Sequence, residues 1–442
     1  MRYTTHSLPY SASFHDYYHE IRQWPGAILL ESAHLGRYDI LTAKPYDVFQ
    51  CLLQDLPHCK PFEILESLVP HEDLSLDIPF QGGVIGYLAY DVGAYTQTQY
   101  IPPTLPGLDK LPCVYFGLYD WAILRDHQKK ETILFAAHRD ASTQSIIKDV
   151  LQQWQSQSQP EATIHSAFTP MMSTEQYQAG FSTIQTALQQ GRCYQVNFTQ
   201  AFQSSFSGDV FALYQTIQQH NPMPYAALLQ LPEAHILCFS PERFLTIDKN
   251  QVIASPIKGT AKRVADPIID QTIQEALQQC EKNRAENVMI VDLLRNDLSK
   301  IATVGSVQVP RLLAIESYTG LHHLVSDVHA TLKNGISPAE ALQHCFPGGS
   351  ITGAPKLEAM RVINEVEHSA RGIYCGNIFY YSAHGRLDSN IAIRTLIAQN
   401  SQLYAYAGGG IVIDSTWESE YAECFTKIHA IQSALQDFQP SY

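Results

Sequence analysis

The sequence is poor in charged residues and above all in basic ones. Charged side chains make up 16% of the 442 residues, well below the roughly 25% of typical soluble domains. Acidic residues outnumber basic ones, and the formal net charge is −14. This lack of positive charge argues against nucleic acid or an anionic membrane as a partner. An anionic substrate would need a metal ion or a few well-placed cations to compensate the acidic field.

Three further features are missing. No apolar run approaches the roughly 18 residues of a membrane span, and residues 1–14 show neither the basic nor the apolar region of a signal peptide. The nine cysteines are odd in number and include no CxxC pair. Such usage favours reduced thiols over a disulfide framework or a zinc site. The sequence therefore predicts a soluble, cytoplasmic protein with no membrane partner.

Helices and strands are expected partly in blocks, which favours an α+β fold with large antiparallel sheets over a doubly wound one. A Gln- and Ser-rich segment, residues 153–160, suggests a boundary between an N-terminal region (1–160) and a C-terminal region (171–437). After it, Ser173 opens a helix that should end near Gln190. A β-hairpin is predicted over residues 244–257 and one long helix over residues 270–295.

Lys258 is the most informative single residue. It follows the predicted hairpin within the segment PIKGT (256–260), at an expected strand end. There Gly259 allows a close approach of backbone and ligand. Desolvation of such a lysine would free its amine to act as a nucleophile. A solvated lysine in a turn is the alternative.

A second candidate catalytic group is Glu242, in the segment SPERF (240–244). It follows an apolar strand and stands beside a proline. A partly buried carboxylic acid in this position suits the protonation of a leaving hydroxyl. An ordinary ion pair with Arg243 at a strand edge is the alternative.

Carboxylates on two predicted helices suggest a metal site. Glu286 lies midway along the long helix, and Glu420 and Glu423 share one face of another, with Lys427 one turn further. Oxygen ligands from two helices could bind a hard divalent ion and leave positions for water and substrate. Spacing alone also allows Glu286 to pair with Lys282, four residues before it.

Two glycine-rich segments and an arginine suggest anion binding. FPGGSITGAPK (346–356) offers backbone N–H groups and the Ser350 hydroxyl just before a helix begins, an arrangement that favours negative charge. AGGG (407–410), expected as a loop after a strand, could hold a second carboxylate. Arg394, at the predicted end of a strand, can bind a carboxylate through two nitrogens. Further polar contacts are expected from His323 and Tyr374.

Seven ordered motifs resemble those of the chorismate-utilising enzymes. They are CYQVN (193–197), SPERF (240–244), PIKGT (256–260), RAENVMIVDLLRND (284–297), HHLVS (322–326), FPGGSITGAPK (346–356) and AGGGIV (407–412). The likeness covers residues 174–435 closely and the first half more loosely, through LLES (29–32) and Gly82-Gly83. It implies two large antiparallel sheets packed face to face with helices outside. The boundary near residue 160 would then be a crossover within one unit.

The resemblance also implies roles for individual residues. Glu286 and Glu423, with Glu420 beside them, match the Mg²⁺ ligands, and Glu242 matches the acid that protonates the departing C4 hydroxyl of chorismate. Positions that contact chorismate are matched by His323, Ser350, Tyr374, Arg394, Gly408, Gly409 and Lys427, with Gln195 among the substrate-site positions. Isochorismate and salicylate synthases carry a general-base lysine where this chain has Gln195. Glutamine cannot deprotonate water, so water is disfavoured as the nucleophile.

Lys258 distinguishes the branches of this family. Anthranilate synthases carry alanine there (PIAGT), whereas the enzymes that form aminodeoxychorismate carry lysine. The implied reaction is attack of Lys258 on C2 with loss of the C4 hydroxyl, followed by displacement by ammonia at C4. The product, 4-amino-4-deoxychorismate, leads to p-aminobenzoate and folate. Anthranilate synthesis is the alternative activity, and a non-catalytic regulator that binds chorismate or tryptophan would require a broken site.

Partners are implied only by the resemblance. No motif of a glutamine amidotransferase is recognisable in the sequence. A separate glutaminase subunit, forming a heterodimer and supplying ammonia, is therefore expected. The family's tryptophan pocket has counterparts in Ser32, Pro224 and Tyr225. Ordinary core packing between the two halves of the chain is the alternative at these three positions.

Overall fold

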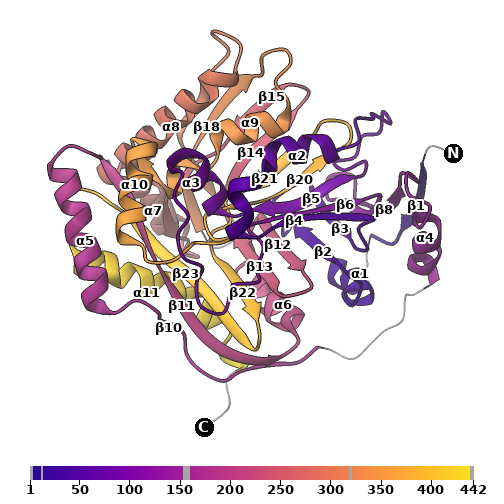
Figure 1. Cartoon of the computed structure of the whole chain (residues 1–442), viewed down its shortest axis with the longest axis horizontal. Helices are drawn as coiled ribbons and strands as arrows, with labels where there is room; N and C mark the ends of the chain where they lie inside the picture. The colour runs from indigo at the N-terminus through magenta and orange to yellow at the C-terminus, as the bar shows by residue number, and fades with distance from the viewer. Residues whose placement is uncertain (1–2, 11–12, 153–159, 318–320, 439–442) are drawn as a thin grey trace.

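The structure is a computed structural model that describes residues 3–10, 13–152, 160–317 and 321–438. Two large antiparallel sheets pack face to face and helices cover them from outside (Figure 1). The predicted α+β class and the sandwich of two sheets are thereby confirmed. Within these ranges, no helix is long and apolar enough to cross a membrane.

The larger sheet has thirteen strands in the described ranges. Its order is β1 (Thr4–Leu8), β8 (Glu131–Ala136), β7 (Trp121–Asp126), β3 (Tyr38–Thr42), β2 (Ile28–Glu31), β12 (Tyr225–Gln230), β13 (His235–Ser240), β22 (Thr395–Gln399), β23 (Gln402–Ile411), β11 (Gln195–Gly208) and β10 (Thr169–Pro170). Two short strands, β9 (Ala162–Ile164) and β19 (Gly353–Ala354), also pair with β11.

The smaller sheet has ten strands in the described part of the chain. Its order is β16 (Ile257–Lys262), β18 (Leu321–Thr331), β15 (Gln251–Ala254), β14 (Arg243–Asp248), β21 (Leu387–Asn390), β20 (Asn377–Ser382), β5 (Gly83–Leu88), β6 (Val114–Tyr119) and β4 (Asp47–Cys51), and β17 (Gln308–Ser317) also pairs with β18. β16 and β4 therefore lie at opposite ends of this order.

The helices divide into groups that cover different parts of the sheets. They are α1 (Phe14–Ile21), α2 (Pro61–Leu68), α3 (Tyr90–Thr98), α4 (Thr143–Gln152), α5 (Thr174–Gln189), α6 (Val210–His220), α7 (Pro267–Gln279), α8 (Glu281–Ile301), α9 (Pro338–Cys345), α10 (Lys356–Val366) and α11 (Trp417–Ala434). α5, α6, α10 and α11 contribute to the core on the outer face of the larger sheet. α2, α8 and α9 contribute to the core that contains the inner faces of both sheets.

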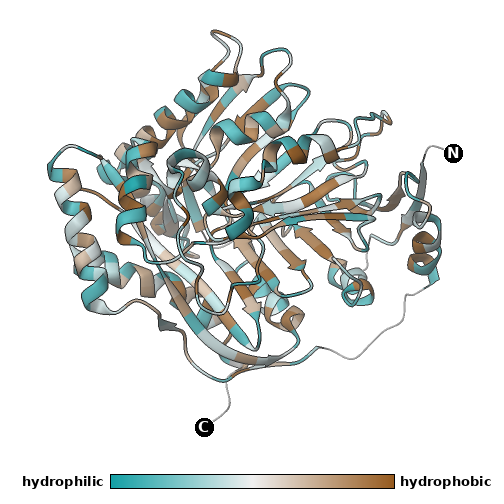
Figure 2. Cartoon of the chain, viewed as in Figure 1, coloured by the Kyte–Doolittle hydropathy of each residue, from teal (hydrophilic) through white to brown (hydrophobic). Residues whose placement is uncertain are grey.

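Alternation along the strands of the larger sheet assigns residues to these two cores. In β2, Ile28 packs into the core between the sheets and Leu29 into the core beneath the outer helices. In β3, Ile40 likewise packs into the core between the sheets and Leu41 into the core beneath the outer helices. Successive side chains of a strand point to opposite faces, so a strand covered on both faces must be apolar throughout. Figure 2 shows this concentration of apolar residues on the strands, whereas the helices are mixed.

Both sheets combine strands from the two halves of the sequence. β2 pairs with β12 in the larger sheet, and β5 pairs with β20 in the smaller one. The predicted boundary falls on residues 153–160, of which 153–159 lie outside the described residues. Each sheet therefore contains strands from both the N-terminal and the C-terminal region of the chain.

Local structure follows the sequence in most of the segments that position the site. The Ser173 capping box is present, with reciprocal bonds to Gln176, and α5 ends just before Gln190. β14 and β15 form the predicted hairpin. The single long helix predicted over residues 270–295 is wrong. An extended backbone at Cys280 separates α7 from α8, which lets α7 pack against β16 and β17 while α8 packs mainly against β18.

A buried ion pair connects α10, β11 and the glycine-rich segment 346–356. Arg371, 1% exposed, contacts Glu367 through Nε and Nη2, each at 2.7 Å. The same guanidinium donates to the backbone oxygens of Ile351 (2.7 Å) and Asn197 (2.9 Å). Glu367 also accepts hydrogen bonds from the backbone N–H and hydroxyl of Thr199. Two side chains thereby fix α10, β11 and the glycine-rich segment 346–356 relative to one another.

We expect Glu367→Gln to lower the free energy of unfolding by about 3–5 kcal/mol, because it leaves a buried guanidinium without its counter-charge. Urea denaturation of the purified chain measures this loss. Glu365→Gln is the control, since Glu365 also pairs with an arginine, Arg192, but lies 45% exposed on the same helix. That exposed pair should contribute at most about 1 kcal/mol. Equal losses in the two variants would contradict the special role of the buried pair.

Candidate active site

A cavity of about 450 Å³ lies between the two sheets and brings the predicted residues together. Its walls come from β16 and β18 of the smaller sheet, β11 and β23 of the larger sheet, and helices α8 and α11. Twelve sequence-predicted residues line it: Glu242, Lys258, Glu286, His323, Ser350, Tyr374, Arg394, Gly408, Gly409, Glu420, Glu423 and Lys427. Segments up to 185 residues apart in the sequence thus meet at one site, as Glu242 and Lys427 show.

Glu242 lies in the turn between β13 and β14 with its side chain buried. Its backbone N–H donates to the Ser240 hydroxyl (3.1 Å), and its Oε1 accepts from the Ser350 hydroxyl (3.1 Å). Burial raises the pKa of Glu242 to about 7, although the Lys258 ammonium opposes the rise. At neutral pH roughly half of the carboxyl groups thus carry a proton. The alternative prediction, an ion pair between Glu242 and Arg243, is wrong, because Arg243 pairs with Asp388 (3.0 Å).

Lys258 is the second residue of β16, an edge strand, where the sequence predicted a strand end. The pairing with β18 shifts register between Ile257 and Thr260. Such a bulge re-aims side chains relative to a regular strand. Gly259 has φ +83°, and a Cβ there would lie 2.8 Å from the Asn283 amide nitrogen. The bulge and the glycine together let the lysine chain enter the cavity close to α8.

His323 extends from β18 into the cavity beside Lys258's strand. Its Nδ1 lies 2.9 Å from the Thr260 hydroxyl. Burial and the positive charge of Arg394 lower the pKa of His323 to about 4. The ring is therefore neutral at physiological pH and can contact a substrate as a dipole without adding positive charge.

Arg394 provides a cation in the wall of the cavity, near enough to His323 for its charge to act on that ring. It has a left-handed backbone (φ +52°) and directly precedes β22, so the prediction that it ends a strand is wrong. Its guanidinium contacts the Met223 sulfur at 3.7 Å, and no ion pair to it is found among the described residues. Burial lowers its pKa. A largely buried, uncompensated guanidinium favours an anionic ligand.

Glycines 408–410 lie inside β23, whereas the sequence predicted a loop after a strand. A Cβ at Gly408 would approach the Phe198 carbonyl oxygen to 2.0 Å, and one at Gly409 would lie 2.7 Å from Glu420 Oε2 and 3.5 Å from Glu423 Oε1. Glycine is therefore required at both positions. At Gly408 it allows the strands to pack closely, and at Gly409 it leaves space in front of the two carboxylates. Lys427 donates to the Gly408 oxygen (2.6 Å) and pairs with Glu423 (2.7 Å).

The candidate metal ligands occupy two walls of the cavity. Glu420 and Glu423 extend from α11, and Glu286 extends from α8. Burial and the neighbouring Glu423 raise the pKa of Glu420, although Ser415 donates a hydrogen bond to it. Among the described residues, no group of three or more His, Cys, Asp or Glu side chains is already close enough to hold a metal. Two carboxylates around the space above Gly409 still fit Mg²⁺, which takes few protein ligands and keeps water and substrate oxygens.

Two other predicted positions line the cavity through different contacts. Ser350 lies in a short 3₁₀ turn, Gly349–Ile351, and holds Glu242 as described above. Tyr374 is 6% exposed and stacks on Tyr406, with ring centroids 5.3 Å apart. Gln195 is different, because it is not among the residues that line the cavity. Its amide lies behind Gly410, within 2.0 Å of where a Cβ at that glycine would be.

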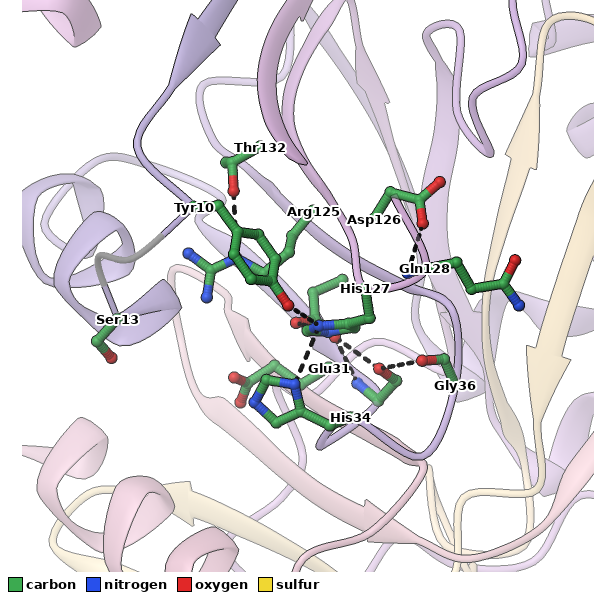
Figure 3. Close-up of polar contacts among 12 residues, drawn as sticks. Tyr10, Ser13, Glu31, His34, Gly36, Arg125, Asp126, His127, Gln128 and Thr132 are labelled. Atoms are coloured by element: carbon green, nitrogen blue, oxygen red, sulfur yellow. Dashed lines mark hydrogen bonds and ion pairs between the residues drawn. The ribbon is translucent and has the colours of Figure 1, made fainter. Parts of the chain in front are cut away.

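Ser32, Pro224 and Tyr225 meet at a second cavity of about 140 Å³, distinct from the first. Asp39 accepts hydrogen bonds from the backbone N–H and hydroxyl of Ser32, each at 2.8 Å. The other Asp39 oxygen contacts His127 Nε2 at 2.7 Å. His127 Nδ1 lies 3.0 Å from the Nδ1 of His34, and Figure 3 shows these two rings together. The three predicted residues therefore share one site. Tryptophan as its ligand stays a prediction.

Comparisons with known proteins agree with this geometry. The family described as chorismate binding enzyme matches residues 26–433. Aminodeoxychorismate synthase component 1 of Salmonella typhimurium is 39% identical over 95% of each chain. The chain belongs to the chorismate-binding enzymes. Anthranilate synthase component 1 of Lactococcus lactis is 33% identical over 84% of each chain, and anthranilate synthase component I of Streptococcus pneumoniae superposes with a TM-score of 0.81, at 27% identity over 90% of this chain and 92% of that one.

Several residues of this chorismate-binding enzyme line the cavity although the sequence did not single them out. They are Asn197, Thr260, Lys282, Asn283 and Tyr406, among others. Some lie within recognised motifs, such as Asn197 in CYQVN and Thr260 in PIKGT. The sequence suggests Lys282 only as an ion-pair partner of Glu286. No such pair within 4 Å occurs in the described residues, and the Lys282 charge instead acts on Glu420.

We expect Glu242→Gln to stabilise this chorismate-binding enzyme at alkaline pH. The folded-state pKa of about 7 lies above the ordinary value near 4.5, so folding becomes less favourable as pH rises through that window. The ionised carboxylate costs up to about 3 kcal/mol above pH 7. The variant lacks this cost, so its advantage in unfolding free energy should be absent near pH 4 and full near pH 8. Denaturation at both pH values tests this, with exposed Glu233→Gln as control, and a pH-independent difference would contradict it.

Proposed function

We propose that this chain is the chorismate-aminating component of an aminodeoxychorismate synthase. It converts chorismate and ammonia to 4-amino-4-deoxychorismate, for p-aminobenzoate and folate synthesis. The observation that carries the proposal is the position of Lys258, in the cavity and close enough to Glu242 for its charge to lower the pKa of that acid. The curated relatives that bear this name, in Salmonella typhimurium for example, support it.

The chain supplies a nucleophile and an acid for the two steps. The unprotonated Lys258 amine attacks C2 of chorismate, both conjugated double bonds of the ring shift, and the C4–O bond breaks. Glu242 gives its proton to the departing hydroxyl, which leaves as water. The Glu242 carboxylate takes up a proton from the attached Lys258 nitrogen. Ammonia then forms a bond to C4, the two double bonds shift back, and the C2–N bond breaks as the Lys258 amine leaves with a proton from the new C4 ammonium group. Arg394 and the neutral His323 provide a cation and a dipole for the substrate's carboxylate and polar groups.

We propose that Glu286, Glu420 and Glu423 hold Mg²⁺. When bound, the ion supplies positive charge for a substrate carboxylate and compensates the local acidic field. The support is the pair of carboxylates around the space above Gly409, together with Glu286 on the facing helix. Lys427, which pairs with Glu423, would keep that carboxylate oriented.

The names of the relatives, component 1, imply a second component. We propose that it is a glutaminase that forms a heterodimer with this chain and supplies ammonia. We place the reaction in the cytoplasm, where the nine free cysteines would remain reduced. Anthranilate synthesis is the competing activity, favoured by the similarity to the Lactococcus lactis and Streptococcus pneumoniae enzymes. Lys258, at the position where anthranilate synthases carry alanine, argues against anthranilate synthesis.

Lys258→Ala should abolish formation of 4-amino-4-deoxychorismate, because no other amine would attack C2. The assay incubates the chain with chorismate, Mg²⁺ and ammonium, and identifies the product by chromatography and mass. Lys262→Ala is the control, since Lys262 lies exposed on the same strand. Unchanged product formation in Lys258→Ala would refute the covalent role. Anthranilate as the product of the unaltered chain would refute the proposed function.

Glu423→Gln should weaken Mg²⁺ binding at least about tenfold, because a neutral amide replaces an ionic oxygen ligand. Isothermal titration calorimetry with Mg²⁺ and chorismate measures binding apart from turnover. Glu418→Gln is the control, since Glu418 is an exposed carboxylate on the same helix. Equal Mg²⁺ affinity in the two variants would remove Glu423 from the metal site.

A further inference from the structure

The hairpin formed by β17 and β18 carries different residues on its two faces. His323 lines the cavity of the candidate active site. His322 is the preceding residue of the same strand, so its side chain points to the opposite face. There it lies opposite Ser317 in the strand pairing, on the side that α7 covers. The α7 side of this hairpin is therefore separate from the site of the proposed function.

Ser317, His322 and Asp270 form a chain of hydrogen-bond contacts on the α7 side. Ser317 Oγ lies 2.8 Å from His322 Nδ1, and His322 Nε2 lies 3.0 Å from Asp270 Oδ1. Hydrogen bonds from the Val264 N–H, and then from His322 and Arg263, lower the pKa of Asp270, although burial opposes the shift. Asp270 is therefore an ionised acceptor. In a neutral imidazole the proton then lies on Nε2, and Nδ1 accepts the hydrogen of the Ser317 hydroxyl.

Exposure differs along this chain of contacts in the way that catalysis by a serine requires. Ser317 is exposed at the end of β17, whereas His322 is 0% exposed and Asp270 is buried. A reachable hydroxyl, a shielded base and a group that orients the base together activate a serine. Ser207 provides a contrast, because its hydroxyl lies 2.8 Å from His165 Nε2. His165 is exposed and contacts no carboxylate in the described part of the chain.

A polar cavity of about 510 Å³ adjoins these three residues. Its lining includes Arg263, Asp270, Gln274 and Ile315. Ser317 follows Ile315 by two residues within a regular stretch of strand pairing, so the two side chains share one face of β17. Gln274 Nε2 lies 3.5 Å from the ring nitrogen that contacts Asp270. A guanidinium and an amide in this position can donate to an oxygen on which negative charge develops.

We propose that Ser317, His322 and Asp270 form a second catalytic site, which hydrolyses small polar carboxylic esters. The Ser317 oxygen bonds to the carbonyl carbon of the ester while its proton passes to His322 Nδ1. The C–O bond to the alcohol breaks, and the alcohol leaves with that proton. Water then attacks the acyl carbon and gives a proton to Nδ1, and the bond to Ser317 breaks as the serine oxygen takes this proton. The ester and water thus become an acid and an alcohol, while Asp270 keeps the ring oriented.

The first test treats the full-length chain with a fluorophosphonate probe, which bonds covalently to activated serines, and maps the labelled peptides by mass spectrometry. We expect the label at Ser317 and none at Ser207, because only the histidine beside Ser317 is held by a carboxylate. If the three side chains only fastened α7 to the hairpin, Ser317 would stay unlabelled, and that result would overturn the proposal. Labelling at Ser207 before Ser317 would overturn it as well.

The second test measures turnover with p-nitrophenyl acetate. Ser317→Ala should lower the rate above the uncatalysed background at least about tenfold, because it removes the nucleophile that the base activates. Ser207→Ala is the matched control and should leave the rate unchanged. Equal rates in the native chain and Ser317→Ala would overturn the proposal even where the probe labels Ser317.

A third variant tests the base. His322→Gln should abolish both the label and the turnover although Ser317 is still present. Circular dichroism and thermal unfolding show whether each variant folds, and Ser317→Ala changes only an exposed position, so the proposal stays testable if His322→Gln does not fold. Full labelling of Ser317 in folded His322→Gln would overturn the role of the histidine.

Discussion

The buried ion pair between Arg371 and Glu367 sets the positions of the walls that surround the chemistry. Its guanidinium uses its donors on Glu367 and on the backbone oxygens of Ile351 and Asn197. Those two residues line the cavity from different segments. A planar, always charged side chain can hold several acceptors at fixed angles. Desolvation makes a buried ion pair costly to form, and removing one partner leaves an uncompensated buried charge. The pair therefore holds these segments in one arrangement.

Desolvation is also the common cause of the electrostatics inside the cavity. It raises the pKa of Glu242, lowers that of His323 and lowers that of Arg394. Each shift favours the neutral form of the group, as expected where water is excluded. The result is an acid that keeps a proton near neutrality beside Lys258, in the same cavity as a guanidinium without a carboxylate partner in the described residues. A site of this kind suits an anionic substrate from which a hydroxyl must depart as water.

Much of this could be predicted from the sequence because the information is local or lies in motifs. The capping box at Ser173 is a four-residue signal, and the structure reproduces it. Helices and strands come partly in blocks along the chain, so the α+β class followed from the order of the elements. The motif resemblance brought distant residues such as Glu242 and Lys258 into one predicted site. The break at Cys280 could not be predicted in this way, since its extended backbone follows from how α7 and α8 pack against different strands.

The sequence by itself determined the α+β class, through the order of its elements, and the identity of the reactive groups. The two packed sheets were implied by the motif resemblance. Element order, caps and motif residues are all properties of neighbours along the chain. Only the tertiary structure decided which way those groups face. In the folded chain Arg243 pairs with Asp388, so Glu242 is free to line the cavity. The Gln195 amide lies behind Gly410 and does not line the cavity. Burial, charge and contact depend on what the fold places beside a residue, and spacing along the chain does not contain that information.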